Sequence, residues 1–195
     1  MLADDALDTL FRRARSQNGF LDRPVAPQTL EALYELMKFG PTSANCSPLR
    51  VVFLASREAR HRLLPAMSPG NVDKTMSAPV VAVLGYDLGF HRHARLLFPH
   101  RPAMFDAFAQ DAALAQDTAF RNGTLQAAYL MVAARALGLD CGPMSGFDAA
   151  AVQRLFFPAD PDVRVNFLCN LGHGDPAKVF PRLPRLPFEA ACAIL

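Results

Sequence analysis

The chain has 195 residues, of which 51% are hydrophobic and 19% are charged, and its formal net charge is +2 at pH 7. A chain of this length is expected to form one domain over residues 1–195 with a sizeable core. The small net charge argues against a nucleic-acid binder, and no apolar run approaches the ~18 residues of a membrane span, so neither partner is expected.

The predicted elements of the first half are helices and strands in alternation. Leucines recur at helical spacing before residue 39, and runs of valine and leucine mark the strands. The helices are predicted over residues 2–13, 29–39 and 57–64, and the strands over residues 51–55 and 79–84. Ser56 is placed to cap the third helix. The second strand is apolar on both faces, which is typical of a buried strand.

The second half centres on a long helix predicted over residues 114–137 and ended by Gly138. Its latter part is apolar around most of its circumference, which is typical of a buried helix. Residues 87–111 show no clear period and are expected to be irregular, with a short helix near residues 102–108. The remaining predictions are an extended segment at 141–145, a helix from Asp148 to 156, a strand over 163–171, and a proline-rich tail from Asp175 with a short strand or turn near 190–195.

These elements indicate an α+β fold, with helices surrounding a small central sheet. The strands are too few and too unevenly spaced for a doubly wound sheet. No G-x-G-x-x-G follows a strand, so a Rossmann nicotinamide site is not supported. The apolar share lies slightly above the usual range, which fits a large core and a subunit that buries surface against a partner equally well.

The cysteines and histidines do not form recognisable metal or disulfide motifs. No C-x-x-C spacing occurs among Cys46, Cys141, Cys169 and Cys192. His91 and His93 have no carboxylate or cysteine at ligand spacing, so no metal site is expected. The N-terminus is rich in Asp and lacks the apolar segment of a secretory leader. We therefore expect reduced thiols and a cytoplasmic protein.

A polar turn at residues 40–48 joins the second predicted helix to the first strand. A Gly-Pro pair ending at Pro41 stops the helix. Thr42, Ser43 and Asn45 can then present hydroxyl, amide and backbone groups from one rigid turn, as a flat polar heterocycle would require. An ordinary helix-to-strand loop explains the same residues equally well.

This turn resembles the Pro-[Ser/Thr]-Ser-x-Asn-x-x-Pro flavin-binding signature of the FMN-dependent nitroreductase family. Further segments match in the same order, so the resemblance covers nearly the whole chain. The malonic semialdehyde reductase subgroup of the Rut pyrimidine-degradation pathway is similar in residues 14–19, 40–48, 96–100, 118–122 and 142–148. The resemblance implies a nitroreductase-like fold with a mainly antiparallel sheet, and a homodimer that binds FMN at its interface.

The resemblance also implies which residues bind FMN. They are Arg15, Ser16, Asn18, Pro41, Thr42, Ser43, Asn45, Asn71, Lys74, Pro143, Met144, Ser145, Gly146 and Arg185. Arg15 and Ser16 offer donors for the phosphate. Ala14 and Asn18 replace basic residues of the family pattern, and Arg185 matches the family's C-terminal basic position and could make up that deficit. Taken alone, Arg185 is better explained as a surface arginine.

Two further groups are implied to contact the flavin ring. Asn71 and Lys74 would lie at the pyrimidine edge, where the Lys74 charge would stabilise the reduced anion. The alternative for Lys74 is a solvated loop lysine. The segment 142–146 would point a backbone N–H at N5, since glycines permit close approach. The alternative for this segment is a plain turn between two elements.

The implied activity is that of an oxidoreductase in which NADH or NADPH reduces FMN and a second substrate follows in a ping-pong cycle. The subgroup implies reduction of malonic semialdehyde to 3-hydroxypropanoate, and a broad nitroreductase or quinone reductase is the alternative acceptor class. A non-catalytic flavin carrier or sensor and a structural helical partner remain open. No acid–base dyad is needed, and the sequence identifies no catalytic side chain. Arg101 or Arg121 is a candidate for binding a substrate carboxylate, with a surface ion pair as the alternative.

Overall fold

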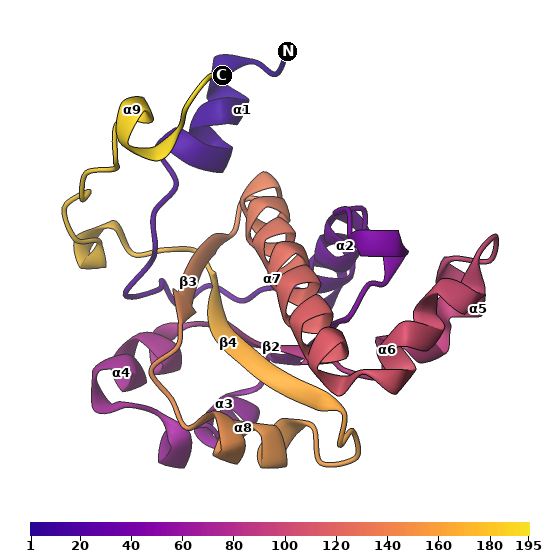
Figure 1. The fold of residues 1–195 in the computed structure, drawn as a ribbon. Coiled ribbons are helices and arrows are strands. Elements are labelled where there is room, and N and C mark those ends of the chain that lie inside the picture. The colour runs from indigo at the N-terminus through magenta and orange to yellow at the C-terminus, as the bar shows by residue number, and fades with distance from the viewer.

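A computed structural model describes all 195 residues and places a four-stranded antiparallel sheet among helices (Figure 1). The strands are β1 (Leu49–Leu54), β2 (Val80–Asp87), β3 (Asp140–Met144) and β4 (Val163–Gly172). Their order across the sheet is β1-β2-β4-β3, and every neighbouring pair is antiparallel. The predicted α+β fold is therefore confirmed, and β2 is buried along its whole length as its apolar sequence indicates.

The helices follow the predicted positions closely where caps mark them. They are α1 (Asp4–Leu7), a π-helical turn (Asp8–Arg12), α2 (Pro27–Met37), α3 (Arg57–His61), α4 (Pro69–Ser77), α5 (Ala94–Leu97), α6 (Asp106–Gln110), α7 (Ala112–Ala136), α8 (Ala149–Phe156) and α9 (Phe188–Ala191). Ser56 caps α3 by accepting from the Ala59 N–H at 3.0 Å. Asp148 caps α8 by accepting from the Ala151 N–H at 2.9 Å. Each cap satisfies a helix donor that has no partner within the helix.

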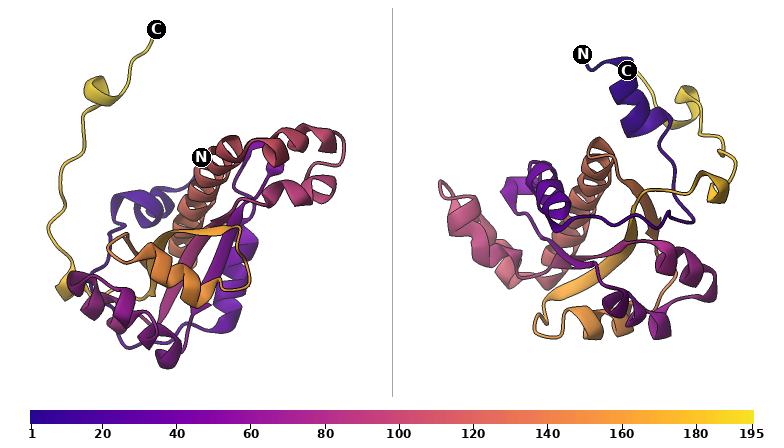
Figure 2. Two further views of the ribbon diagram at one scale, coloured as in Figure 1. Left: turned by 60° about the horizontal axis from the view of Figure 1, so that its bottom comes forward. Right: turned by 180° about the vertical axis from the view of Figure 1, so that it is seen from behind.

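The helices form a layer on each face of the sheet, with α2 and α7 on one side and α3, α4 and α8 on the other (Figures 1 and 2). Successive side chains of β2 alternate between these two cores, as the pleat of a strand requires. Val80 and Leu84 pack with α2 and α7, whereas Val81 and Val83 pack on the opposite side. The central strand therefore ties both layers together.

Residues 88–111, predicted to be irregular, are ordered around aromatic side chains. They fold as α5, α6 and short 3₁₀ turns. Phe90 and Phe105 are buried there in a separate cluster that also contains Cys46, from the polar turn before β1. This segment, called the excursion below, therefore packs against the polar turn. Its sequence shows no helical or strand periodicity, because only a few side chains form this small aromatic cluster.

The structure differs from the predicted elements at three places. Residues 71–74, to which no element was assigned, lie in helix α4, so the alternative of a loop lysine at Lys74 is wrong; Pro69 begins this helix at a position where its missing N–H costs nothing. The chain end, predicted as a short strand or turn near 190–195, forms the single helical turn α9, and no strand of the sheet lies there. The latter part of α7 is not buried all round, since Leu125 and Tyr129 are 46% and 44% exposed.

The C-terminal tail leaves the body of the molecule after β4 (Figure 2). Its apolar side chains are largely exposed in the single chain, namely Phe180, Leu183, Leu186, Phe188, Ile194 and Leu195. None of the helices has both the length and the hydrophobicity that crossing a bilayer would require.

Candidate functional site

A pocket of about 520 Å³ forms where the N-terminal segment meets the C-terminal tail. It gathers all the residues predicted to bind a phosphate, which come from both ends of the chain. The polar lining consists of Arg12, Arg15, Ser16, Asn18, Arg135, Arg182 and Arg185. Three arginines that the motif does not suggest, Arg12, Arg135 and Arg182, therefore line the pocket together with Arg15 and Arg185.

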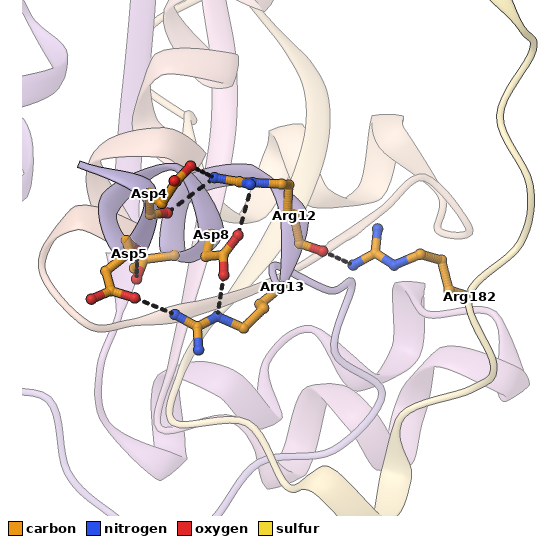
Figure 3. A network of polar contacts seen from close by, with 7 residues as sticks. Asp4, Asp5, Asp8, Arg12, Arg13 and Arg182 are labelled. Atoms are coloured by element: carbon orange, nitrogen blue, oxygen red, sulfur yellow. Dashed lines mark hydrogen bonds and ion pairs between the residues drawn. The ribbon is translucent and has the colours of Figure 1, made fainter. Parts of the chain in front are cut away.

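The tail is anchored to the N-terminal segment by arginine–carbonyl hydrogen bonds. Arg15 donates to the Phe180 carbonyl. Arg182 donates to the Arg12 carbonyl at 2.7 Å (Figure 3) and to the Ala14 carbonyl at 2.9 Å. The two ends of the sequence therefore build one wall of the pocket together.

The charges around this pocket are not all free to meet a ligand. Figure 3 shows Arg12 paired with Asp4 at 2.7 Å and with Asp8 at 2.8 Å. Arg15, Arg135 and Arg185 have no carboxylate within ion-pair distance, and the Nε of Arg135 is buried without a partner. Unpaired guanidinium groups beside the Ser16 hydroxyl fit a phosphate, because they offer charge-assisted donors in a fixed geometry. This part of the site therefore fits the phosphate of FMN.

The N-terminal segment that lines this pocket runs on beside β3, at one edge of the sheet. The Gln17 N–H donates to the Cys141 carbonyl at 2.9 Å, so the N-terminal segment runs beside that strand. A side chain on Gly142 would come within 2.7 Å of the Gln17 carbonyl oxygen. Gly142 therefore lets the backbone of the N-terminal segment, at Gln17, lie close to β3.

The end of β3 carries the segment predicted to face N5. The Gly146 carbonyl accepts from the Ser68 N–H at 3.1 Å and from the Asn71 amide at 2.8 Å. A Cβ on Gly146 would lie 2.5 Å from that amide nitrogen. Asn71, predicted to contact the flavin, is therefore committed to holding Gly146. A hollow of about 410 Å³ lies beside this segment and is lined by Met131, Pro143, Met144, Ser145, Asn166 and Phe167.

Lys74 lies on α4, near the same edge of the sheet. It is partly buried and forms no ion pair, and burial lowers the pKa of its amine from the usual value. Its backbone carbonyl accepts from the Asn170 amide of β4 at 3.1 Å, which ties α4 to the sheet. An unpaired, partly dehydrated cation of this kind suits the electron-rich edge of a heterocycle.

The fourth predicted group, residues 41–45, lies at the opposite edge of the sheet. This turn leads into β1, which three inter-strand spacings, or about 14 Å, separate from β3. Asn45 donates to the Leu97 carbonyl at 2.9 Å, so the turn contacts the excursion instead of the other groups. A single chain therefore brings the phosphate residues, α4 and the end of β3 together, and leaves this turn apart.

Several residues of the site were missed by sequence reasoning. Arg135 and Arg182 come from segments distant from the N-terminal motif, and no local pattern connects them. Gln17 and Asn170 are buried polar side chains whose Oε1 and Oδ1 atoms have no partner. Asn170 interrupts the fully buried apolar end of β4, between Cys169 and Leu171, which is a signal that could have identified it.

The candidates for binding a substrate carboxylate lie near the polar turn. Arg121 is on α7, next to Asn122, whose side chain contacts Ser43 at 2.8 Å. Arg101 follows the segment that contacts Asn45. Both arginines are exposed, and neither forms an ion pair, so the alternative of a surface ion pair is not observed.

Comparison with known proteins gives a consistent family. The model of the nitroreductase family matches residues 11–173. HadB of Ralstonia pickettii, assigned by name as an NADH dehydrogenase/NAD(P)H nitroreductase, is 59% identical over 100% of both chains. A Cupriavidus pinatubonensis protein with the same assignment is 58% identical over 100% of both chains. A solved Exiguobacterium sibiricum structure, described as a nitroreductase in complex with FMN, has a TM-score of 0.87 and 20% identity, covering 100% of this chain and 99% of that chain. This last likeness concerns the fold.

Proposed function

The chain belongs to the nitroreductase family, and from that premise we propose that it works as a homodimer with FMN bound between the two subunits. It is an oxidoreductase that uses FMN and NAD(P)H. When bound, FMN supplies the reversible two-electron chemistry that links NAD(P)H to a second substrate. The two substrates would use the same site in turn, in a ping-pong cycle.

The observation that carries the dimer proposal is the division of the site between two edges of one sheet. The phosphate pocket, Lys74 and Gly146 lie at the β3 side, whereas the turn at 41–45 precedes β1. A two-fold dimer can place the turn of one subunit against the β3 side of the other, because each subunit then offers the group that its partner lacks.

The exposed stripe on α7 supports the same proposal. Leu114, Leu125 and Tyr129 are 42%, 46% and 44% exposed, and their spacings of 11 and 4 residues place them on one side of the longest helix. Apolar side chains grouped in this way usually mark a contact with another protein surface. The exposed apolar side chains of the tail add further surface that a second copy would cover.

Each part of the site would have a distinct role toward FMN. Arg15 and Arg185 would hold the phosphate with charge-assisted hydrogen bonds. Lys74 would place its charge at the pyrimidine edge and favour the reduced form. The turn at 41–45 of the partner would cover the ring and leave one face accessible to substrates. Acid–base side chains are not needed, since a substrate oxygen can take its proton from water.

For the acceptor we propose an aromatic nitro compound or a quinone, because the relatives at 59% and 58% identity carry nitroreductase names. Malonic semialdehyde is the second candidate. The unpaired Arg101 and Arg121 favour it, since they could bind the carboxylate that this substrate carries. A panel with both classes decides between them by the larger kcat/KM, and Arg121→Ala should lower kcat/KM selectively for the carboxylate-bearing substrate.

An absorbance spectrum of the purified protein tests the cofactor first. Bound oxidised flavin gives bands near ~370 and ~450 nm. Light scattering coupled to size-exclusion chromatography then tests the dimer. Bleaching of the ~450 nm band by NADH or NADPH in a stopped-flow experiment supports an enzyme. A flavin that neither nucleotide bleaches would support a carrier or sensor, and a colourless monomer would overturn the proposal.

A further inference from the structure

The polar turn before β1 contains an unusual backbone. Ala44, Asn45 and Ser47 have φ values of 49°, 54° and 40°, and they are the chain's only non-glycine residues in the left-handed region. Side chains with a Cβ adopt this region at a steric cost, so such a run persists only where its surroundings hold it. The contacts that hold this turn therefore decide its shape.

Two buried amide side chains from α7 hold the turn at both ends. The Oδ1 of Asn122 accepts from the Ser43 N–H at 2.8 Å, just before the left-handed run. The Oε1 of Gln126 accepts from the Leu49 N–H at 2.9 Å, just after it. The two side chains are 3% and 5% exposed and one helical turn apart, so they form a rigid pair.

The orientation of the Asn122 amide is determined by its own helix. Its nitrogen donates to the Thr118 carbonyl at 2.8 Å, which leaves the oxygen facing the turn. Gly123 lets α7 approach β2 closely, because a Cβ there would lie 2.8 Å from the Cβ of Tyr86. The helix is therefore near enough for short side chains to reach the backbone below it.

The same contacts use groups that would otherwise be offered to a ligand. The Thr42 hydroxyl accepts from the Ser47 N–H at 3.2 Å, and the Ser43 N–H is taken by Asn122. The Asn45 amide is taken by the Leu97 carbonyl. Of the side chains predicted to face FMN from this turn, the Ser43 hydroxyl and the Asn45 Oδ1 keep polar groups without a partner in the chain.

We propose that Asn122 and Gln126 are positioning residues of the flavin site, which hold the strained 42–48 turn in the shape that the partner's FMN requires. The proposal rests on the FMN-binding dimer described above. Neither amide needs to touch the cofactor. Because each accepts from a backbone N–H, replacing either one leaves a buried donor without a partner and lets the turn relax.

The decisive variants are Asn122→Leu and Gln126→Leu, which keep similar volume and remove the acceptor. Asn122→Asp serves as the conservative variant, because a buried carboxyl in its neutral form can accept from the Ser43 N–H and donate to the Thr118 carbonyl. Gln116→Leu is the matched control on the same helix, since Gln116 contacts the hydroxyl of Tyr86 at 2.7 Å and not the turn.

Two measurements on the purified holoenzyme read the shape of the turn and its effect on FMN. The first is the alkylation rate of Cys46, in a Cys192→Ser background that removes the exposed thiol. Cys46 is 1% exposed, and burial raises its pKa to about 11, so it reacts at pH 8 only when the turn opens. The second is the Kd for FMN after removal and titration of the cofactor.

We expect both leucine variants to speed alkylation of Cys46 and to raise the Kd for FMN by about tenfold or more, the effect of losing one buried hydrogen bond. Asn122→Asp should stay within about threefold of the wild type, as should Gln116→Leu. Unchanged alkylation and FMN affinity in both leucine variants would overturn the inference, and so would an equal effect of Gln116→Leu. If the wild type binds no FMN, the proposed function is rejected. The alkylation rates of Cys46 would still show whether Asn122 and Gln126 hold the turn closed.

Discussion

The two sides of the proposed flavin site are built in different ways. At the β3 side, binding groups are charged side chains that converge from the N-terminal segment, α7 and the tail. At the β1 side, the turn at 42–48 offers mainly a backbone shape, with three non-glycine residues in the left-handed region. At the β3 side, several arginines contribute positive charge independently of one another. At the β1 side, the shape of the turn depends on a few hydrogen bonds that act together.

This difference has an energetic consequence. A left-handed conformation costs roughly 1–3 kcal/mol for each non-glycine residue, so the turn needs several buried contacts to persist. A hydrogen bond to a charged group contributes about 1.5–3 kcal/mol, and the loss of one such bond leaves others in place. Each single substitution at the β3 side should therefore weaken FMN binding by a limited amount. FMN should lose the contacts of both sides at once only when the two subunits separate.

The largest expected effect comes from separating the two sides. Leu125→Glu places a charge in the exposed stripe of α7, where association would have to bury it without a partner. We expect a monomer and a Kd for FMN raised by about 100-fold or more, because half of the site is lost. Light scattering and flavin titration measure both. A control, Leu96→Glu, changes a side chain that is 78% exposed on the excursion and should leave the dimer intact.

The next effect tests the charged side alone. Arg185→Ala removes one unpaired guanidinium of the phosphate pocket and should raise the Kd for FMN about tenfold. Riboflavin lacks the phosphate, so its affinity should not change in this variant. Arg13→Ala, which alters an arginine outside the pocket lining, is the matched control. Equal losses for FMN and riboflavin would mean that Arg185 does not act on the phosphate.

A smaller effect concerns the ring edge. Lys74→Met removes a partly buried, unpaired charge, and it should lower the flavin midpoint potential by about 30 mV or more while changing FMN affinity little. The charge matters chiefly for the reduced form. Burial lowers the pKa of this amine, so the wild-type potential should fall toward that of the variant as the pH rises through the lowered pKa. Lys38→Met is the control; an unchanged potential in Lys74→Met would contradict this role.

The smallest effect is expected in the N-terminal ion-pair network of Figure 3. Asp4→Asn removes a carboxylate from an Arg12 side chain that is 54% exposed, and exposed pairs of this kind contribute little. The midpoint of thermal unfolding should therefore stay nearly constant. FMN affinity should rise slightly at low salt, because one negative charge beside the pocket is removed and Arg12 keeps only its pair with Asp8, and the gain should disappear at high salt. A gain that persists at high salt would contradict the electrostatic explanation.

Sequence patterns predicted much of the fold because the signals were local. Ser56 and Asp148 cap helices through groups three residues away, and the apolar run of β2 matches a strand buried on both faces. Helix α4 was missed because its apolar positions are few, although Pro69 offered a start signal. Within the segment predicted to be irregular, only the helix near residues 102–108 was predicted; the remaining order was missed because it comes from contacts between aromatic side chains.

The candidate site was predicted in part for the same reason. Arg15 and Ser16 belong to one short motif, and the structure places both in the phosphate pocket with Arg185. Arg135 is contributed by the end of α7, at a separation that no short motif spans. Asn122 and Gln126 are two amides four residues apart on an apolar helix, a spacing that indicates one face but not what that face contacts.

The sequence by itself determined which chemical groups are present, where helices begin, and which strand is buried, since these depend on neighbours a few residues apart. Only the tertiary structure decided that the strands run in the order β1-β2-β4-β3 and that the turn at 41–45 lies far from Gly146. Strand order arises from contacts between distant segments, and local periodicity carries no information about which edges those segments will occupy.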